Sequence, residues 1–208
     1  MDNEDILAVL RRRTRCEHDA IERSVPLMSD SVTVGAYTRT IERFYGFWQP
    51  MEERLRATLG LRECGFNLSE REKARLLALD LRSLSVGDVA SLPLCADLPD
   101  VSDVTSAFGC LYVIEGATLG GQIINRHLRA RLNVTPESGG RFFHGYGAET
   151  GLMWKAFCSQ LGAHALTLPS HGPLVDAAIA TFRSLRQWLE RRDTPATRPL
   201  GDTLLRQQ

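Results

Sequence analysis

The stretch from residue 104 to residue 132, VTSAFGCLYVIEGATLGGQIINRHLRARL, decides the fold of this chain. Its pattern predicts one long helix from about Val104 to Leu132. Glycine recurs inside that helix, and each interior glycine costs about 1 kcal/mol relative to alanine. Some close contact with the bare backbone must compensate for this cost.

Three of these glycines share one face of the helix. Gly109, Gly116 and Gly120 are spaced by seven and four residues, which keeps them on one side. We expect them to open a groove where another group approaches the backbone closely. Tight packing of a second helix and a flat, wide ligand both fit this pattern, and the glycines would also let the helix bend over such a ligand.

Apolar residues at three- and four-residue steps predict further helices around this stretch. No run alternates with period two over more than a few residues, so the fold is predicted to be all-α. We expect one domain over residues 1–192 and a loose C-terminal tail over 193–208. The other expected features are a first helix from about Asn3 to Arg23, a second capped by Ser31 with a kink or break at Pro50, a third opened by a capping box at 69–72, a connector at 92–103, an irregular piece at 136–147, a helix at 149–164, and a last helix with Pro173 in its first turn.

Composition excludes several classes of protein. The 208 residues carry 25 Lys and Arg against 25 Asp and Glu, and 43% are hydrophobic, which excludes a disordered chain and makes nucleic-acid binding an unlikely role. The five cysteines form no C-x-x-C pair, so neither a disulfide framework nor a zinc site is predicted. The acidic start lacks the features of a secretory signal, and Glu115 inside the most apolar stretch argues against a membrane span. We expect a cytoplasmic protein.

A histidine stands out on the first predicted helix. His18 follows Thr14 on the apolar stripe and precedes Glu22 by one turn, so we expect an inward imidazole beside a carboxylate. A buried histidine satisfied by Glu22 is one interpretation. A metal ligand is the other, and a single histidine suits heme iron better than zinc, which needs three or four protein ligands.

Two arginines lie on roughly the same side of that helix. Arg11 and Arg15 precede His18 by seven and three residues. They are either part of a solvated basic face or a clamp for the carboxylates of a ligand, because guanidinium pairs with carboxylate bidentately.

Together these motifs resemble the heme oxygenase family, in its bacterial, biliverdin-producing branch often associated with bacteriophytochromes. Leu10, Arg11, Thr14, His18 and Glu22 are similar to the proximal-helix pattern, and the run LYVIEGATLGGQ at 111–122 is similar to the distal-helix signature. FFHGYG at 142–147 and WKAF at 154–157 resemble the segment that closes the heme edge. The resemblance implies a helical bundle with heme between the proximal and distal helices.

The resemblance also implies roles for particular residues. His18 would be the iron ligand, with Glu22 orienting it, and Gly116 and Gly120 would be the distal, catalytic backbone over the porphyrin. The remaining heme contacts would be Tyr112 and, at the propionates, Arg11, Arg15 and Lys155. Heme would be both cofactor and substrate, oxidised by O₂ to biliverdin, carbon monoxide and ferrous iron. The implied partners are an electron donor, such as a ferredoxin, a reductase or ascorbate, and a bacteriophytochrome that receives biliverdin.

One position departs from the family pattern. Ala117 stands where many members carry an aspartate that holds a distal water network, so protons for oxygen activation must come from elsewhere. Three alternatives therefore stay open: a heme sensor or carrier without turnover, a related fold that has lost heme and acts on another small molecule, and a helical bundle that serves only in interactions.

Overall fold

The computed structural model describes residues 5–191, so the tail expected at 193–208 lies outside the described residues. All regular elements within this range are helical and none is a strand, which confirms the all-α prediction. The long helices are α1 (Ile6–Ser24), α2 (Val34–Ala57), α3 (Ala74–Ser83), α4 (Val104–Leu132), α6 (Thr150–Ala165) and α7 (Gly172–Glu190), with a short α5 (Arg141–His144) and the 3₁₀ turns η1 (Leu68–Glu70), η2 (Val89–Ser91), η3 (Pro136–Ser138) and η4 (Gly147–Glu149).

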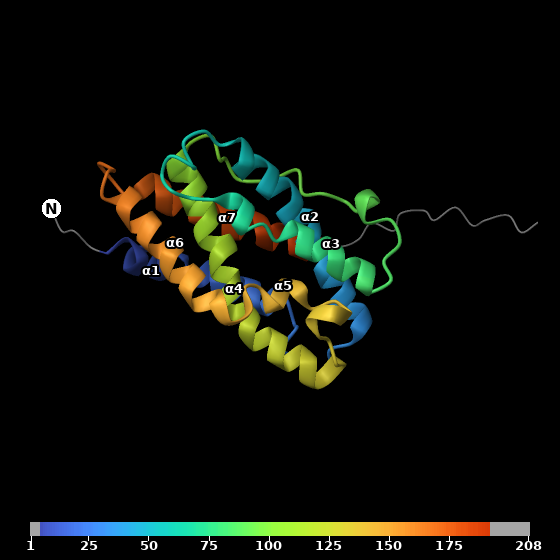
Figure 1. The fold of residues 1–208 in the computed structure, drawn as a ribbon. Helices are drawn as coiled ribbons and strands as arrows, with labels where there is room; N and C mark the ends of the chain where they lie inside the picture. The colour runs from blue at the N-terminus through green and yellow to red at the C-terminus, as the bar shows by residue number, and fades with distance from the viewer. Residues whose placement is uncertain (1–4, 192–208) are drawn as a thin grey trace, which may run out of the picture.

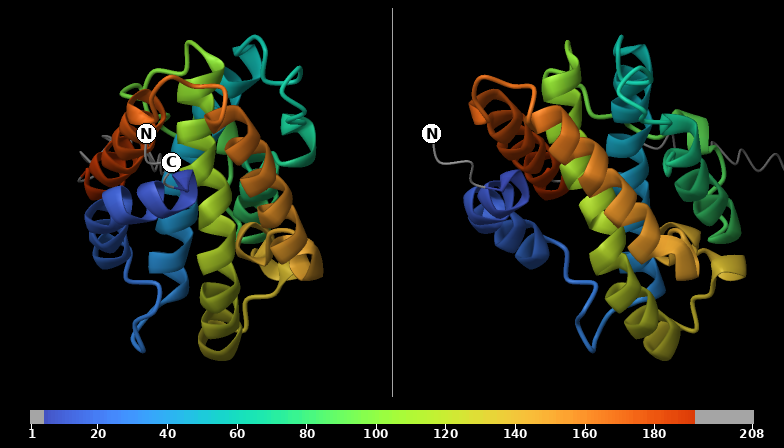
Figure 2. Two further views of the ribbon diagram at one scale, coloured as in Figure 1. Left: turned by 90° about the vertical axis from the view of Figure 1, so that its left-hand side faces the viewer. Right: turned by 60° about the vertical axis from the view of Figure 1, so that its left-hand side comes forward.

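The helix α4 runs through the middle of the bundle (Figure 1). It packs most extensively on α7, and α6 lies alongside it in both views of Figure 2. The helix α1 packs on α7 and touches α6, whereas it makes no extensive contact with α4. The core between these helices is aromatic, with fully buried rings at Phe47, Trp48, Phe108 and Phe157.

The expected bounds of α4 are confirmed at both ends. Asp103 begins it as an N-cap whose side chain accepts from the Ser106 N–H, and Asn133 ends it in the left-handed conformation.

By length and composition α4 could cross a membrane, since its most apolar window has a mean hydropathy of 1.3, but 56% of that window is buried inside the protein. Burial in the bundle accounts for its apolar composition.

The start of α2 differs from expectation, and of the kink or break expected at Pro50 the break does not occur. Thr33 caps the helix in place of Ser31, and its hydroxyl accepts from the Ala36 N–H at 3.2 Å. Pro50 does not break the helix, although proline cannot donate to the carbonyl four residues earlier. That carbonyl, on Gly46, instead accepts from the Cys95 N–H at 2.8 Å. The connector at 92–103 thus supplies the hydrogen bond that proline removes.

The capping box expected at 69–72 is wrong. Ser69 lies in the η1 turn and donates to the Asn67 side chain, and α3 begins only at Ala74. The cap comes from Glu52 on α2, whose carboxylate accepts from the backbone N–H of Lys73 at 2.6 Å and of Ala74 at 3.1 Å. A cap donated by a distant helix leaves no local signal in the sequence.

The remaining helices agree with expectation to within a few residues. Described α1 begins at Ile6, with Asp5 as its N-cap, while the expected start at Asn3 lies outside the described residues. Pro173 lies in the first turn of α7, as predicted. The piece at 136–147 consists of short helical turns, which place the aromatic pair Phe142 and Phe143 in the core.

Candidate functional site

The glycines of α4 do not share one environment. A Cβ at Gly109 would lie 2.4 Å from the Leu174 carbonyl oxygen, so this glycine permits close packing of α7. A Cβ at Gly116 would meet only the Trp154 ring, at 3.8 Å, and one at Gly120 would meet nothing within 4 Å. The expected three-glycine groove is therefore wrong at Gly109. At Gly116 the Trp154 ring of α6 lies at ordinary contact distance, whereas Gly120 leaves backbone that no neighbouring helix covers.

The open backbone belongs to an exposed apolar face. Leu119 is 40% exposed and Ile123 is 58% exposed, and they lie at helical spacing beside Gly116 and Gly120. We call these four residues the glycine face. A solvent-exposed apolar surface on the central helix of a bundle is unusual, because such residues gain free energy when a partner covers them.

The orientation expected for His18 is wrong. Its side chain is 55% exposed and not buried, because only the first half of α1 is buried, at Ile6, Leu10 and Thr14. The ring lies edge-on to Phe182 of α7, with a centroid distance of 6.0 Å. His18 Nδ1 is 3.8 Å from a carboxylate oxygen of Glu22, as the spacing predicted, and also 3.8 Å from one of Asp19.

These three side chains could hold a metal ion together, since their ligand atoms lie within 4.8 Å of one another. Because the His18 side chain is 55% exposed, the interpretation of His18 as a buried histidine satisfied by Glu22 is also wrong. The imidazole is accessible to a ligand from solvent.

The expected cations lie on exposed parts of α1 and α6. Burial raises the pKa of the Tyr112 hydroxyl on α4 and of the Cys158 thiol on α6, and the positive charge of Arg11 opposes this effect at both groups. The charge of Arg11 on α1 therefore acts on groups of two other helices. Lys155 is exposed on α6 one turn before Cys158, and Arg15 is exposed on α1 one turn after Arg11. Lys155 directly follows Trp154, whose ring centre lies 6.0 Å from that of Tyr112.

A buried charged cluster behind the glycine face was not predicted. Glu115 is 1% exposed and accepts from Arg71 Nη1 at 2.6 Å and from the Tyr146 hydroxyl at 2.9 Å. Lys73 Nζ lies 4.0 Å from Glu115 and 3.6 Å from the centre of the Tyr146 ring. The sequence held one signal, a carboxylate in its most apolar helix, but it did not show which cations pair with it.

Burial shifts the pKa values in and beside this cluster. The pKa of Lys73 falls to about 8 because burial disfavours the ammonium, although Glu115 opposes this effect. The pKa of Tyr146 is raised well above its ordinary value by burial and by the negative charge of Glu115. The Tyr146 hydroxyl therefore keeps its proton and donates a hydrogen bond to the Glu115 carboxylate.

Two surface cavities lie away from the glycine face. One, of about 470 Å³, lies between the α1–α2 connection, α2 and the end of α7, and includes Arg39 and Arg43. The other, of about 420 Å³, lies between residues 97–99 and α7. Neither of these two cavities includes a residue of α4, so the glycine face is part of neither.

Comparison with known proteins gives the family. The sequence model of the heme oxygenase family matches residues 4–191. The chain belongs to the heme oxygenase family. This confirms the family suggested by the motifs at 10–22 and 111–122. No curated protein matches the sequence significantly.

Solved structures of two bacterial heme oxygenases share the fold. The enzyme from Neisseria meningitidis, solved with NO and CO bound, is similar with a TM-score of 0.73 and 20% identity, over 92% of this chain and 95% of that one. The heme oxygenase from Leptospira interrogans is similar with a TM-score of 0.73 and 18% identity, over 89% of this chain and 98% of that one.

The residues of this heme oxygenase family member fit heme. A porphyrin is flat and apolar and carries carboxylates at one edge. Gly120, where a Cβ would meet nothing, gives a flat ring access to the backbone of α4, and Leu119 and Ile123 provide apolar contact. Arg11 and Lys155 provide cations that pair with carboxylates.

Proposed function

We propose that this protein is a bacterial heme oxygenase of the biliverdin-producing, bacteriophytochrome-associated branch. It oxidises heme with O₂ and reducing equivalents to biliverdin, carbon monoxide and ferrous iron. The observation that carries the proposal is the uncovered backbone at Gly120, one turn after the half-buried Gly116, in a chain of this family. Packing between helices does not account for Gly120, because a side chain there would meet nothing within 4 Å.

His18 is the proposed iron ligand. Its exposed imidazole can reach a ligand, and the nearby Glu22 carboxylate can orient the ring. Bound heme supplies the iron at which O₂ is activated. Gly116 and Gly120 would bring peptide backbone close to the bound ring, and at Gly120 no atom of another element lies within 4 Å of the position that a Cβ would take.

The other site residues hold the ring in place. Arg11, Arg15 and Lys155 pair with the propionates, and Tyr112 contacts the ring from the half-buried side of α4. Leu119 and Ile123 exclude water from the covered face. Ala117 is exposed and its methyl side chain can donate no hydrogen bond, so backbone groups beside Gly116 have to orient the proton donors there.

The reaction needs partners that the chain does not contain. A ferredoxin, a reductase or ascorbate supplies electrons, and a bacteriophytochrome is the proposed acceptor of biliverdin. We place this reaction in the cytoplasm.

A second candidate function is a heme sensor or carrier without turnover. The exposed alanine at 117 favours it, because this position offers no side chain for proton delivery. A steady rise of biliverdin absorbance in the presence of reductant would exclude it.

Replacement of single histidines tests the proposed ligand. The purified protein is expected to bind one hemin with the spectrum of an axial imidazole, and His18→Ala should shift that spectrum and abolish turnover. Four matched variants, each losing one of the other histidines, should keep both: His127→Ala, His144→Ala, His164→Ala and His171→Ala. Loss of the spectrum in one of these four, and not in His18→Ala, would overturn the assignment.

A further inference from the structure

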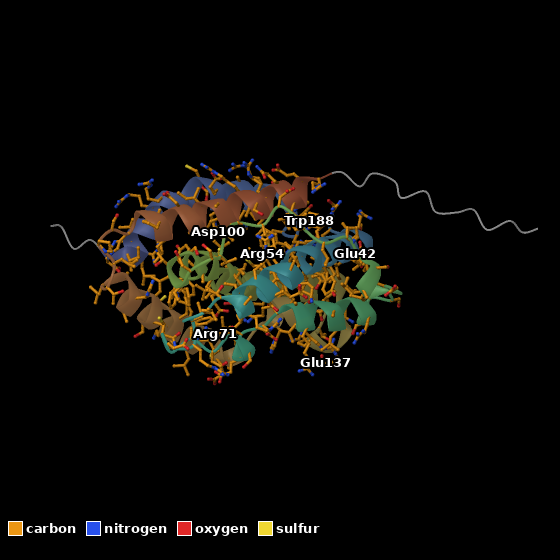
Figure 3. All side chains as sticks on the ribbon, turned by 90° about the horizontal axis from the view of Figure 1, so that it is seen from above. Glu42, Arg54, Arg71, Asp100, Glu137 and Trp188 are labelled. Atoms are coloured by element: carbon orange, nitrogen blue, oxygen red, sulfur yellow. The ribbon has the colours of Figure 1, made fainter. Side chains whose placement is uncertain are left out.

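The buried cluster behind the glycine face joins two walls of the proposed site. Arg71 follows the η1 turn between α2 and α3, and Figure 3 labels it on that segment. Its side chain is 6% exposed, and its Nη1 donates both to Glu115 on α4 at 2.6 Å and to the Met153 carbonyl on α6 at 3.2 Å. One guanidinium therefore holds α4 and α6 at once.

The two points that Arg71 holds are next to the distal wall. Glu115 immediately precedes Gly116, and Met153 immediately precedes Trp154. The Trp154 ring is the one group within 4 Å of the position that a Cβ on Gly116 would take, at 3.8 Å. The same side chain therefore contacts both helices one residue before Gly116 and Trp154.

Other members of the cluster hold Arg71 and Glu115 in place. Lys73 Nζ donates to the Arg71 carbonyl at 2.8 Å, which anchors the backbone of the segment. The Tyr146 hydroxyl donates to both carboxylate oxygens of Glu115, at 2.9 and 3.0 Å. The carboxylate therefore has partners on several sides and little freedom to turn.

Stability alone is a weak reason for such a cluster. Burying charges costs free energy that their attraction often only offsets, and apolar residues of similar volume are frequently as stable. What an ion pair with fixed donors provides is a defined geometry.

We propose that Arg71, through Glu115 and Met153, is a positioning residue that sets the spacing of Gly116 and Trp154 and thus the shape of the distal wall over the heme. The proposal rests on the proposed function. Arg71 itself touches neither Gly116 nor the ring of the substrate. Its effect is transmitted by the backbone of the two residues that it holds.

Two variants and a matched control test this role. Arg71→Met removes both hydrogen bonds, and Glu115→Gln keeps the shape of the side chain but removes its charge. Arg56→Met is the control, because Arg56 is 56% exposed and makes its 2.6 Å ion pair with Glu72, which is outside the cluster. For each protein we would measure the C–O stretching band of the reduced, CO-bound hemin complex, and hydrogen exchange at residues 116–121 without hemin.

The expected result is local. Arg71→Met should keep the axial-imidazole spectrum but shift or split the C–O band, and exchange at 116–121 should be faster. Glu115→Gln should change both in the same direction by less, and Arg56→Met should match the wild type.

An unchanged band with unchanged exchange in Arg71→Met would overturn the proposal. If that variant does not fold, the same result in Glu115→Gln would overturn it. If the wild type binds no hemin, the proposed function fails, and the exchange measurement alone decides whether Arg71 positions this segment.

Discussion

Single glycines of α4 separate ligand binding from packing. Gly120→Ala adds a methyl group into open space and raises helix propensity, so without hemin the protein should gain up to about 1 kcal/mol of unfolding free energy. The same methyl would stand over the porphyrin, so hemin binding or turnover should fall. Urea unfolding without hemin, together with hemin turnover, measures both effects.

Gly109→Ala is the contrasting variant. Its methyl carbon would lie 2.4 Å from the Leu174 carbonyl oxygen, which forces α7 away from α4. Overpacking of this kind costs roughly 1–3 kcal/mol, with or without hemin. A comparable loss of stability in Gly120→Ala would show that packing, and not a ligand, explains both glycines.

The buried carboxylate of Glu52 gives the protein a pH-dependent stability. Burial raises its pKa from 4.5 to about 7, against the opposing effect of the two backbone N–H groups that it caps. The folded protein then holds the proton more tightly than the unfolded chain does. The contribution of Glu52 to stability is therefore complete below about pH 4.5 and is lost as the pH rises through about 7.

Glu52→Gln should remove this dependence. The unfolding free energy of the wild type, relative to the variant, should fall by an amount on the order of 3 kcal/mol between these two pH values. Urea titrations of both proteins at a series of pH values measure the difference. A difference that stays constant with pH would show that burial does not raise the pKa of Glu52.

At the scale of helices, the true cap of α2 can be tested directly. Thr33→Ala removes the hydroxyl that accepts from the Ala36 N–H and should cost about 1 kcal/mol. Ser31→Ala is the matched control, since Ser31 bonds only to the neighbouring Ser29 in the turn before α2. Equal losses of unfolding free energy in the two variants would contradict this assignment.

The cations at the proposed heme edge come from two helices. Replacement of Arg11, Arg15 or Lys155 alone should weaken hemin binding only several-fold, because each is an exposed contact worth up to about 1 kcal/mol. The biliverdin isomer should be more sensitive, since it depends on how the ring is rotated. Unchanged affinity and unchanged isomer in the triple variant would remove these residues from the site.

Periodicity predicted the helices well where the signals are local. The bounds of α4 agree because Asp103 and Asn133 are caps within the sequence itself. The prediction failed where a distant group decides the outcome. Glu52 from α2 caps α3, and the Cys95 N–H takes over the carbonyl left free by Pro50.

For the site as a whole, the sequence predicted candidate residues but not how they are placed. The spacing gave the contact of His18 with Glu22, but the exposure of His18 depends on how α1 packs on α7. Likewise, the glycine spacing could not separate Gly109 from Gly120, because their difference is the position of α7. Arg71 has no local motif, and its role follows only from two contacts on other helices.

The molecule as a whole is tested most directly by following hemin bound to the wild-type protein in air, with ascorbate or a reductase as electron donor. The account predicts that the Soret band decays while biliverdin absorbance rises, with release of carbon monoxide and ferrous iron. A Soret band that persists under these conditions would contradict it and identify a heme carrier. Failure to form any hemin complex would contradict the heme site itself.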